Sequence, residues 1–513
     1  MTFVLKSHAR ALRRLRPMSL VVIAVAALCG AATSALAAGR PADQTTQVIV
    51  KLRDTARFRL RGSEIAAIDH RFAPVERRAL EDLNAMLMAN PGVTERGRLF
   101  QRPADELDRE RATAIAAGHS ELADLNNYLR AVTSEPAAAR ALVAALKRNP
   151  LVQTAYVEPP TFPAGLPVRP AAPASLTPLL GSAFAITPAA TSDYESLQGY
   201  LEVAPTGVDA RYAWQHEGGR GEGIHFIDVE GGWNITHEDL KAPFYTSGSH
   251  NADWVDHGTA VLGEILAQDN GFGVTGIAPD VVFGLSSIFP FSSSANAINT
   301  AANQLSAGDV MLIELHRPGP DSGEACACNC SQHEYIAVEY WQADFDAIKA
   351  ATAKGVVVVE AGGNGGMNLD NSIYGGRFDL GVRDSGAIVV GAAKADGTRQ
   401  PTCWTSYGSR VDVHGWGEAV VTTGYGDLYN PGDDNRLYTD SFGGTSGASP
   451  IVVGAAVALQ GVYKQGATST VEVLAPADVR QTLRDTGTAQ GASAKNIGPL
   501  PDLRAAIDSV LGE

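Results

Sequence analysis

The chain has 513 residues, of which 45% are hydrophobic and 19% charged, and its formal net charge is −15. This length exceeds one ordinary domain, and the composition is that of a globular protein with a sizeable core. The acidic balance argues against a nucleic-acid-binding body and against a polybasic membrane surface, so we expect neither nucleic acid nor a membrane as a partner of the mature protein.

Residues 1–37 are predicted to be a signal peptide. Basic residues between Lys6 and Arg16 precede an apolar run at 18–32, and the segment 35–37 (ALA) fits the small-x-small cleavage pattern. The apolar run is too short for a comfortable membrane span. We therefore expect export, either to a periplasm or out of the cell.

Removal of this segment leaves four cysteines, namely Cys326, Cys328, Cys330 and Cys403. An even number of cysteines in an oxidising compartment predicts one or two disulfides. The run CACNC has no second ligand cluster at zinc spacing, which argues against a metal knuckle. Because a Cys-x-Cys bond is strained, we expect a Cys326–Cys330 bond or a bond to Cys403, and the sequence leaves the pairing open.

Residues 43–160 are predicted to form one small α+β domain. The segments 44–52 and 151–159 have the pattern of strands, and the segments 78–89 and 137–148 have the pattern of amphipathic helices. The following residues, 161–194, are rich in proline and alanine and carry little charge, which is typical of an extended linker.

Residues 195–513 are predicted to form an α/β domain. Short apolar strands alternate with helical patterns, and the strands are expected at 223–228, 281–286, 310–315, 355–362 and 386–393. Nearly continuous apolar strands are typical of a parallel sheet with helices on both faces. In such a sheet, ligands and catalytic groups gather where the strands end.

Four polar side chains stand at strand ends or helix starts. Asp228 ends a strand, His257 opens an apolar helical pattern, Asn364 lies in a glycine loop after another strand, and Ser446 precedes the apolar run 451–459. Each alone has an ordinary structural interpretation as a cap or a turn residue. Together they supply what a serine hydrolase needs: a carboxylate that orients a base, a base that activates a hydroxyl, and an amide that binds an oxyanion.

The order Asp, His, Ser and the surrounding segments resemble the subtilisin-like serine peptidases, the subtilases or S8 family. The resemblance covers about 195–510 and is carried by IDVEGG (227–232), HGTAVLGEI (257–265), AGGN (361–364) and GTSGASP (444–450). One departure is Val229, since the family usually has Thr or Ser after the aspartate. An α/β-hydrolase elbow requires G-x-S-x-G and the reverse order of the triad, and Ala448 occupies the last place here.

The resemblance implies a three-layer α/β fold with a mostly parallel central sheet. It also implies a serine-type endopeptidase that acts on polypeptides and needs no cofactor for its chemistry. By this resemblance Asp228 orients the imidazole, His257 is general base and then acid, Ser446 attacks, and Asn364 donates to the oxyanion. We place Ser446 and Pro450 in the first turn of a buried helix, where free N–H groups favour developing negative charge.

The resemblance also implies a substrate strand and a metal site. The segment 313–320 stands where the family binds substrate as an added strand, which implies contacts from Glu314, Leu315 and His316. The loop 267–279 has the spacing of the family's structural calcium loop. The implied calcium ligands are the side chains of Asp239 and Asn270 and the backbone carbonyls of Gln268, Phe272 and Val274. A hydrogen-bonded turn without metal explains the same loop equally well.

The segment NPLVQTAYVEP (149–159) resembles the closing part of inhibitor-like propeptides of such peptidases. Residues 43–160 are therefore expected to assist folding and then to block the cleft, so that the protein is made as a zymogen. We expect self-cleavage after about 158 and before about 195, which leaves the catalytic domain 195–513 as a monomer. The alternative is a catalytically silent subtilase-fold protein that binds peptides or acts as a chaperone. A structural cell-surface protein would need anchors or repeats that the sequence does not show.

Overall fold

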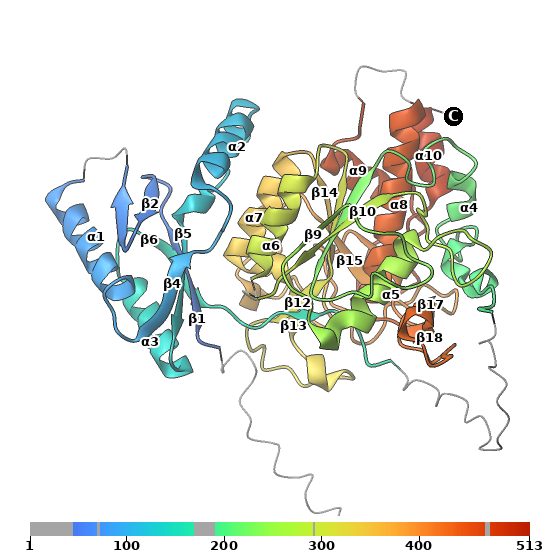
Figure 1. Ribbon diagram of the computed structural model, residues 1–513, viewed down its shortest axis with the longest axis horizontal. Coiled ribbons are helices and arrows are strands. Elements are labelled where there is room, and N and C mark those ends of the chain that lie inside the picture. Colours follow the sequence, from blue (N-terminus) through green and yellow to red (C-terminus); the bar gives the residue numbers. More distant parts are fainter. Residues whose placement is uncertain (1–44, 69–71, 169–189, 291–292, 467–471, 513) are drawn as a thin grey trace, which may run out of the picture. The chain divides into compact units, whose positions relative to one another are not determined.

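A computed structural model describes residues 45–68, 72–168, 190–290, 293–466 and 472–512. The predicted signal peptide at 1–37 lies outside these residues, as does most of the predicted linker at 161–194. Residues 41–513 belong to one compact unit, in which an N-terminal α+β part precedes a larger α/β part (Figure 1).

The N-terminal part is built on a four-stranded antiparallel sheet in the order β4-β5-β1-β6. Its elements are β1 (Gln47–Leu52), β2 (Phe58–Arg61), β3 (Glu64–Ala67), α1 (Pro74–Leu87), β4 (Val93–Arg98), α2 (Ala104–Ala116), β5 (Tyr128–Thr133), α3 (Pro136–Leu146) and β6 (Val152–Val157). Helices α1 and α3 pack on one face, where Val48 and Val50 meet Leu83 and Leu142. The strands and helices expected at 44–52, 78–89, 137–148 and 151–159 are thus all present.

The α/β part is built on a seven-stranded parallel sheet. In spatial order its strands are β16 (Val413–Trp416), β15 (Ile388–Ala393), β14 (Val357–Ala361), β11 (Val310–Ile313), β8 (His225–Glu230), β10 (Val282–Ser287) and β9 (Tyr245–Ser247). The helices are α4 (Ala210–Ala213), α5 (Val255–Leu266), α6 (Ser294–Gln304), α7 (Gln342–Ala353), α8 (Thr445–Gly466), α9 (Pro476–Thr486) and α10 (Leu503–Leu511). Small antiparallel pairs are formed by β7 (Phe162–Pro163), β12 (Leu315–Pro318) and β13 (Tyr335–Ala337), and by β17 (Val420–Thr423) with β18 (Tyr438–Phe442).

Helices cover both faces of this sheet, which makes three layers. Alternate residues of a strand point to opposite faces, so Phe226 of β8 packs with α5, α8 and α10, whereas Ile227 packs with α6 and α7. The core on the α6 and α7 face of the parallel sheet also contains Ile49 and Tyr128 of the N-terminal sheet. The three-layer α/β fold predicted from the sequence is confirmed.

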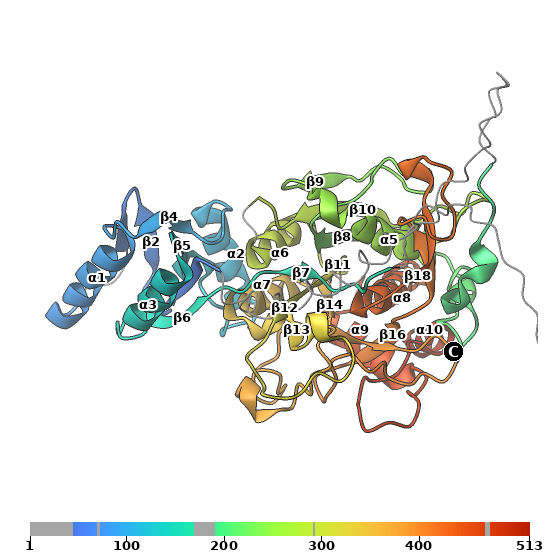
Figure 2. The same ribbon diagram turned by 90° about the horizontal axis from the view of Figure 1, so that it is seen from below.

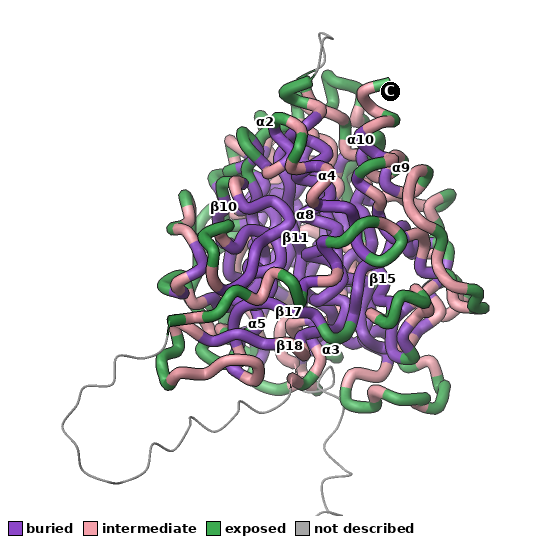
Figure 3. The backbone as a smooth tube through the Cα atoms, turned by 90° about the vertical axis from the view of Figure 1, so that its right-hand side faces the viewer, coloured by how far each residue is buried: buried purple, intermediate pink, exposed green. Residues whose placement is uncertain are grey.

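Helix α8 is the central element of the core on the opposite face, where it packs with α5 and α10. It is long and apolar enough to cross a membrane by length and composition, but that whole stretch is buried inside the protein (Figure 3). The helix begins at Thr445, so Pro450 lies inside it and not in its first turn as expected. Pro450 has no N–H to donate to the carbonyl of Ser446, and this part of the prediction is wrong.

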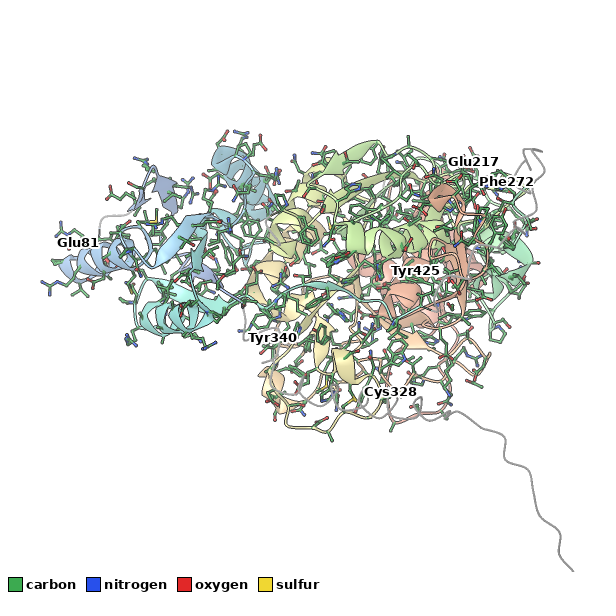
Figure 4. The ribbon with its side chains drawn as sticks, turned by 60° about the horizontal axis from the view of Figure 1, so that its bottom comes forward. Glu81, Glu217, Phe272, Cys328, Tyr340 and Tyr425 are labelled. Carbon is green, nitrogen blue, oxygen red and sulfur yellow. A yellow bond between two sulfur atoms is a disulfide. The ribbon has the colours of Figure 1, made fainter. Side chains whose placement is uncertain are left out.

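Two disulfides brace the loop before β13. Cys326 is bonded to Cys330, and Cys328 is bonded to Cys403 (Cys328 is labelled in Figure 4). Both pairings are among those that the sequence left open, and neither is the strained Cys-x-Cys bond. The second bond ties this loop to the segment after β15, across 75 residues of sequence.

Candidate active site

The nucleophile candidate Ser446 is the second residue of α8 and is fully buried. Its backbone N–H belongs to the first turn, which has no intrahelical acceptor, and donates to the carbonyl of Ala164 at 3.1 Å. The Oγ of Ser446 and the Nε2 of His257 are both buried and have no hydrogen-bond partner among the described residues. The hydroxyl and the imidazole nitrogen are therefore not hydrogen-bonded to each other, and the hydroxyl lies near the carboxyl group of Glu314, whose pKa it lowers.

The imidazole of His257 is oriented by Glu230. His257 lies in the first turn of α5, and its Nδ1 is 2.8 Å from Oε1 of Glu230, the last residue of β8. The ring also packs edge-on against Phe442, with centroids 5.3 Å apart. A carboxylate at Nδ1 holds that nitrogen as the donor and leaves Nε2 able to accept a proton.

Asp228, which the sequence assigned to this role, makes a different contact. Its Oδ2 accepts a hydrogen bond from the indole Nε1 of Trp233 at 2.7 Å, and its Oδ1 has no partner. The contacts favour Glu230 over Asp228 for this role, since the two lie on the same face of one strand, about 6.6 Å apart at about 3.3 Å per residue, and Glu230 is the one that contacts the imidazole. Only Glu230 reaches the end of the strand, where α5 begins. The sequence does distinguish the two carboxylates, because Glu230 is followed directly by Gly231, whereas Asp228 is followed by Val229.

The buried carboxyl groups around Ser446 form an unusual electrostatic setting. Burial and the neighbouring Glu230 raise the pKa of Asp228 well above its usual value, and burial alone raises the pKa of Glu230. Burial and the charge of Asp228 likewise raise the pKa of Glu314. Burial lowers the pKa of His257 to about 4, against an opposing effect of Asp228. The neutral imidazole, which is the form that accepts a proton, is therefore favoured over a wide pH range.

Asn364 follows β14 in the glycine loop and faces the same point as the N–H of Ser446. Its Nδ2 donates to the carbonyl of Ala164 at 2.6 Å. Its Oδ1 accepts from the backbone N–H of Thr445 at 2.8 Å and from the Thr445 hydroxyl at 3.0 Å. Thr445 thus fixes which way the amide points, so that the carbonyl of Ala164 lies between two aimed donors.

The segment after β6 occupies this site as an added strand. Residues 162–163 form β7, which pairs antiparallel with β12 through Leu315↔Pro163 and His316↔Phe162. Figure 2 shows this segment running along β12 toward β18. The backbone of Ala164 donates to the carbonyl of Glu314 at 3.3 Å, and Leu166 donates to the carbonyl of Gly443 at 3.3 Å. The first residues of the predicted linker are therefore bound in the site.

Comparisons with known proteins agree with this geometry. A family model described as "Subtilase family" matches residues 202–498, which is more than half of the chain. The chain belongs to the subtilases. It is therefore a serine-type endopeptidase by family, and polypeptides are its substrate class.

Curated relatives of this subtilase include two subtilisins. Subtilisin DY of Bacillus licheniformis is 29% identical over 54% of this chain and 89% of that protein, and Subtilisin Savinase of Lederbergia lenta is 28% identical over 55% and 89%. Among solved structures, fervidolysin from Fervidobacterium pennivorans, a keratinolytic enzyme related to subtilisin, is 17% identical. It aligns with a TM-score of 0.52 over 91% of this chain and 61% of that one, which supports the fold.

The three residues predicted to bind substrate lie along the bound segment, but their side chains differ from expectation. Glu314 contributes its backbone carbonyl, while its carboxylate accepts from Ser449 of α8 at 2.9 Å and so does not form a polar subsite. Leu315 is buried in the core under α6 and α7. The His316 ring is fully buried, and its Nδ1 accepts from the backbone N–H of Asn364 at 3.3 Å.

The loop predicted to bind calcium is held by hydrogen bonds in an arrangement that does not suit a calcium ion. Oδ1 of Asp239 accepts from Nδ2 of Asn270 at 2.8 Å, and Oδ2 accepts from the N–H of Val274 at 2.8 Å and from Tyr438 at 3.2 Å. Hydrogen-bond donors thus take three of the about four acceptor sites of this carboxylate, where a calcium site would place the ion. The backbone N–H of Gln268 donates to the carbonyl of Asp239 at 2.9 Å.

Phe272, labelled in Figure 4, closes a turn on Oδ1 of Asn270 at 3.1 Å. Of the two interpretations of this loop, the contacts match the hydrogen-bonded turn.

Proposed function

We propose that this subtilase is exported as an inactive precursor and hydrolyses peptide bonds through Glu230, His257 and Ser446, with Asn364 as oxyanion donor. The observation that carries the proposal is the carbonyl of Ala164, held 3.1 Å from the N–H of Ser446 and 2.6 Å from Nδ2 of Asn364. Two preorganised donors on one carbonyl are what stabilises the tetrahedral oxyanion of acyl transfer.

The proposed chemistry follows from which atoms are free. Oγ of Ser446 attacks the carbonyl carbon while Nε2 of His257 takes its proton, and the oxyanion forms between the two donors. Imidazolium then gives the proton to the leaving nitrogen, the C–N bond breaks, and an acyl-enzyme remains on Ser446. Water then attacks the acyl-enzyme by the same steps and releases the carboxylic acid from Ser446. Because Oε1 of Glu230 is bonded to Nδ1 of the imidazole, Glu230 is the acid that we assign to pair with imidazolium.

We assign residues 43–160 the role of an inhibiting propeptide, and contacts with the α/β part support it. Arg317 of β12 is completely buried and pairs with Glu158 at 2.9 Å, and its Nη1 also donates to the carbonyl of Pro159 at 3.0 Å. Tyr128 of β5 donates to Oδ2 of Asp346 on α7 at 2.5 Å. These bonds hold the bound segment in place from its N-terminal side. The signal-like residues 1–37 and the two disulfides support export.

A fluorophosphonate probe tests the function. The wild-type protein after maturation should be labelled on Ser446 and should digest casein. Ser446→Ala should be neither labelled nor active, and Asn364→Ala should lose about 10²- to 10³-fold in kcat, the usual effect of removing one oxyanion donor. Folded wild-type protein that resists the probe and leaves casein intact would favour the silent peptide-binding alternative.

A further inference from the structure

We propose that the precursor cuts itself at the bond between Ala164 and Gly165, and that the mature enzyme prefers a small residue before the scissile bond and glycine after it. This inference rests on the proposed function, because it names the first substrate of that site. The sequence predicts self-cleavage somewhere within 159–194, whereas the contacts of the bound segment favour one bond.

The register of the bound segment selects the bond. Backbone hydrogen bonds hold the chain on both sides: Ala164 donates to Glu314 before the bond, and Leu166 donates to Gly443 after it. An isolated antiparallel bridge pairs Gly165 with Gly444. An extended chain held on both sides cannot slide by one residue without breaking this ladder, since a one-residue slip also turns every side chain to the opposite face. Nδ2 of Asn364 donates to the carbonyl of Ala164 at 2.6 Å and to that of Gly165 at 3.2 Å, but the N–H of Ser446 donates to Ala164. The carbonyl that receives both oxyanion donors is therefore that of Ala164.

The residue after the bond lies against the base. A Cβ built on Gly165 would stand 2.5 Å from Cδ2 and 2.6 Å from Nε2 of His257. The backbone of Gly165 is therefore next to the nitrogen that must return a proton to the leaving group. Contacts below 3.0 Å are essentially never tolerated, so any larger residue would push the imidazole away from Ser446. Glycine at 165 lets base and leaving nitrogen approach each other.

The residue before the bond lies in a confined space. Ala164 is completely buried between Glu314, the residue before β12, which accepts its N–H, and Asn364, which binds its carbonyl. The imidazole of His316 bridges these two walls, since it extends from β12 to the N–H of Asn364 and packs on Tyr335 with centroids 4.7 Å apart. A methyl group fits such a closed gap, and a large side chain does not.

Farther from the bond the site is apolar. Phe162 packs on the ring of Tyr335, with centroids 5.5 Å apart, and Pro163 pairs with Leu315 in the strand. The substrate class is therefore an extended peptide with an apolar residue, proline, and a small residue before a glycine. Hydrolysis consumes one water and yields a carboxylate on Ala164 and an amine on Gly165.

The test is the time course of maturation of the purified full-length precursor. Intact mass of the earliest released fragment and N-terminal sequencing of the remaining chain should give Ala164 as the new C-terminus and Gly165 as the new N-terminus. Ser446→Ala should stay uncut. A first cut at another bond, in protein whose Ser446 takes the fluorophosphonate probe, overturns the proposed bond but keeps the function. Precursor that neither cuts nor labels overturns both.

Two matched variants sharpen the test. Gly165→Val should slow maturation by about 10²-fold, the scale of a 1 Å misplacement in an active site, whereas Gly181→Val, the same change farther along the linker, should have no effect. Because Gly165→Val could also disturb folding, an eight-residue peptide of sequence TFPAGLPV (161–168) is offered to mature wild-type enzyme. It should be cut between Ala and Gly, and replacing Ala by Phe should abolish the cut. Equal cutting of both peptides overturns the preference.

Discussion

Replacing Glu230 should be far more damaging than replacing Asp228, although both carboxyl groups are fully buried on the same strand. Oε1 of Glu230 is 2.8 Å from Nδ1 of His257, and the imidazole becomes positively charged as Ser446 is deprotonated. At an effective dielectric constant of about 20, two unit charges at this distance attract by about 6 kcal/mol. At about 1.4 kcal/mol for each tenfold, Glu230→Gln should slow the acylation step by about 10⁴-fold.

Asp228→Asn is the matched control. Burial and Glu230 raise the pKa of Asp228, and its hydrogen bond goes to Trp233 and not to the imidazole of His257. An amide of the same size keeps an oxygen that accepts from Trp233 Nε1, which is 2.7 Å away in the wild type. We therefore expect Asp228→Asn to retain activity within about tenfold, since no hydrogen bond to the reacting imidazole is removed.

The assay is self-cleavage of the purified precursor, followed by gel electrophoresis. It is a single turnover within one chain, so its rate reports the chemistry without a contribution from substrate binding. Thermal melting of each uncut variant checks folding, and the rate of labelling by a fluorophosphonate gives a second measure of serine reactivity. A loss of about 10⁴-fold in Asp228→Asn, with Glu230→Gln close to wild type, would refute the assignment of the acid.

Three other changes test the surroundings of the site. Glu158→Gln should weaken inhibition of the mature enzyme by the cleaved propeptide at least about 10²-fold, because it removes the nearer of the two carboxylates that pair with buried Arg317, Glu158 at 2.9 Å and Asp344 at 3.8 Å. Glu95→Gln, at an ion pair inside the propeptide whose carboxylate is exposed, should not weaken inhibition, and equal inhibition constants for the two variants would contradict this reasoning. His316→Gly should raise the ratio of kcat/KM for a peptide with Phe before the scissile bond to kcat/KM for the peptide with Ala there by about tenfold or more, because it opens the gap that the imidazole closes. An unchanged ratio would show that other groups set the preference. Burial raises the pKa of Asp239 to about 7, so the free energy of unfolding should fall as pH rises from about 4 to about 7, and Asp239→Asn should flatten that slope. Urea titrations at pH 5 and 8, with and without calcium, measure this. At pH 5 calcium should stabilise neither the wild type nor Asp239→Asn.

Much of the site could be predicted from the sequence because its parts lie in short, characteristic segments. Ser446, His257 and Asn364 each follow glycine-rich or apolar patterns whose local geometry is fixed within a few residues. The apolar strands likewise predicted the parallel sheet, since strands buried on both faces need no polar positions. The acid was harder, because two carboxylates with the same side-chain direction differ only in how far along the strand they lie.

The sequence by itself determined the class of the protein: a buried parallel sheet, a serine at the start of an apolar helix, and an N-terminal α+β part followed by a proline-rich segment. Only the tertiary structure decided that Glu230 faces the imidazole, that Asp239 faces three hydrogen-bond donors, and that the carbonyl of Ala164 lies between the N–H of Ser446 and Asn364. These three facts depend on contacts between residues far apart in the chain. Local patterns cannot specify such contacts, because each is set by where packed helices and strands bring their ends together.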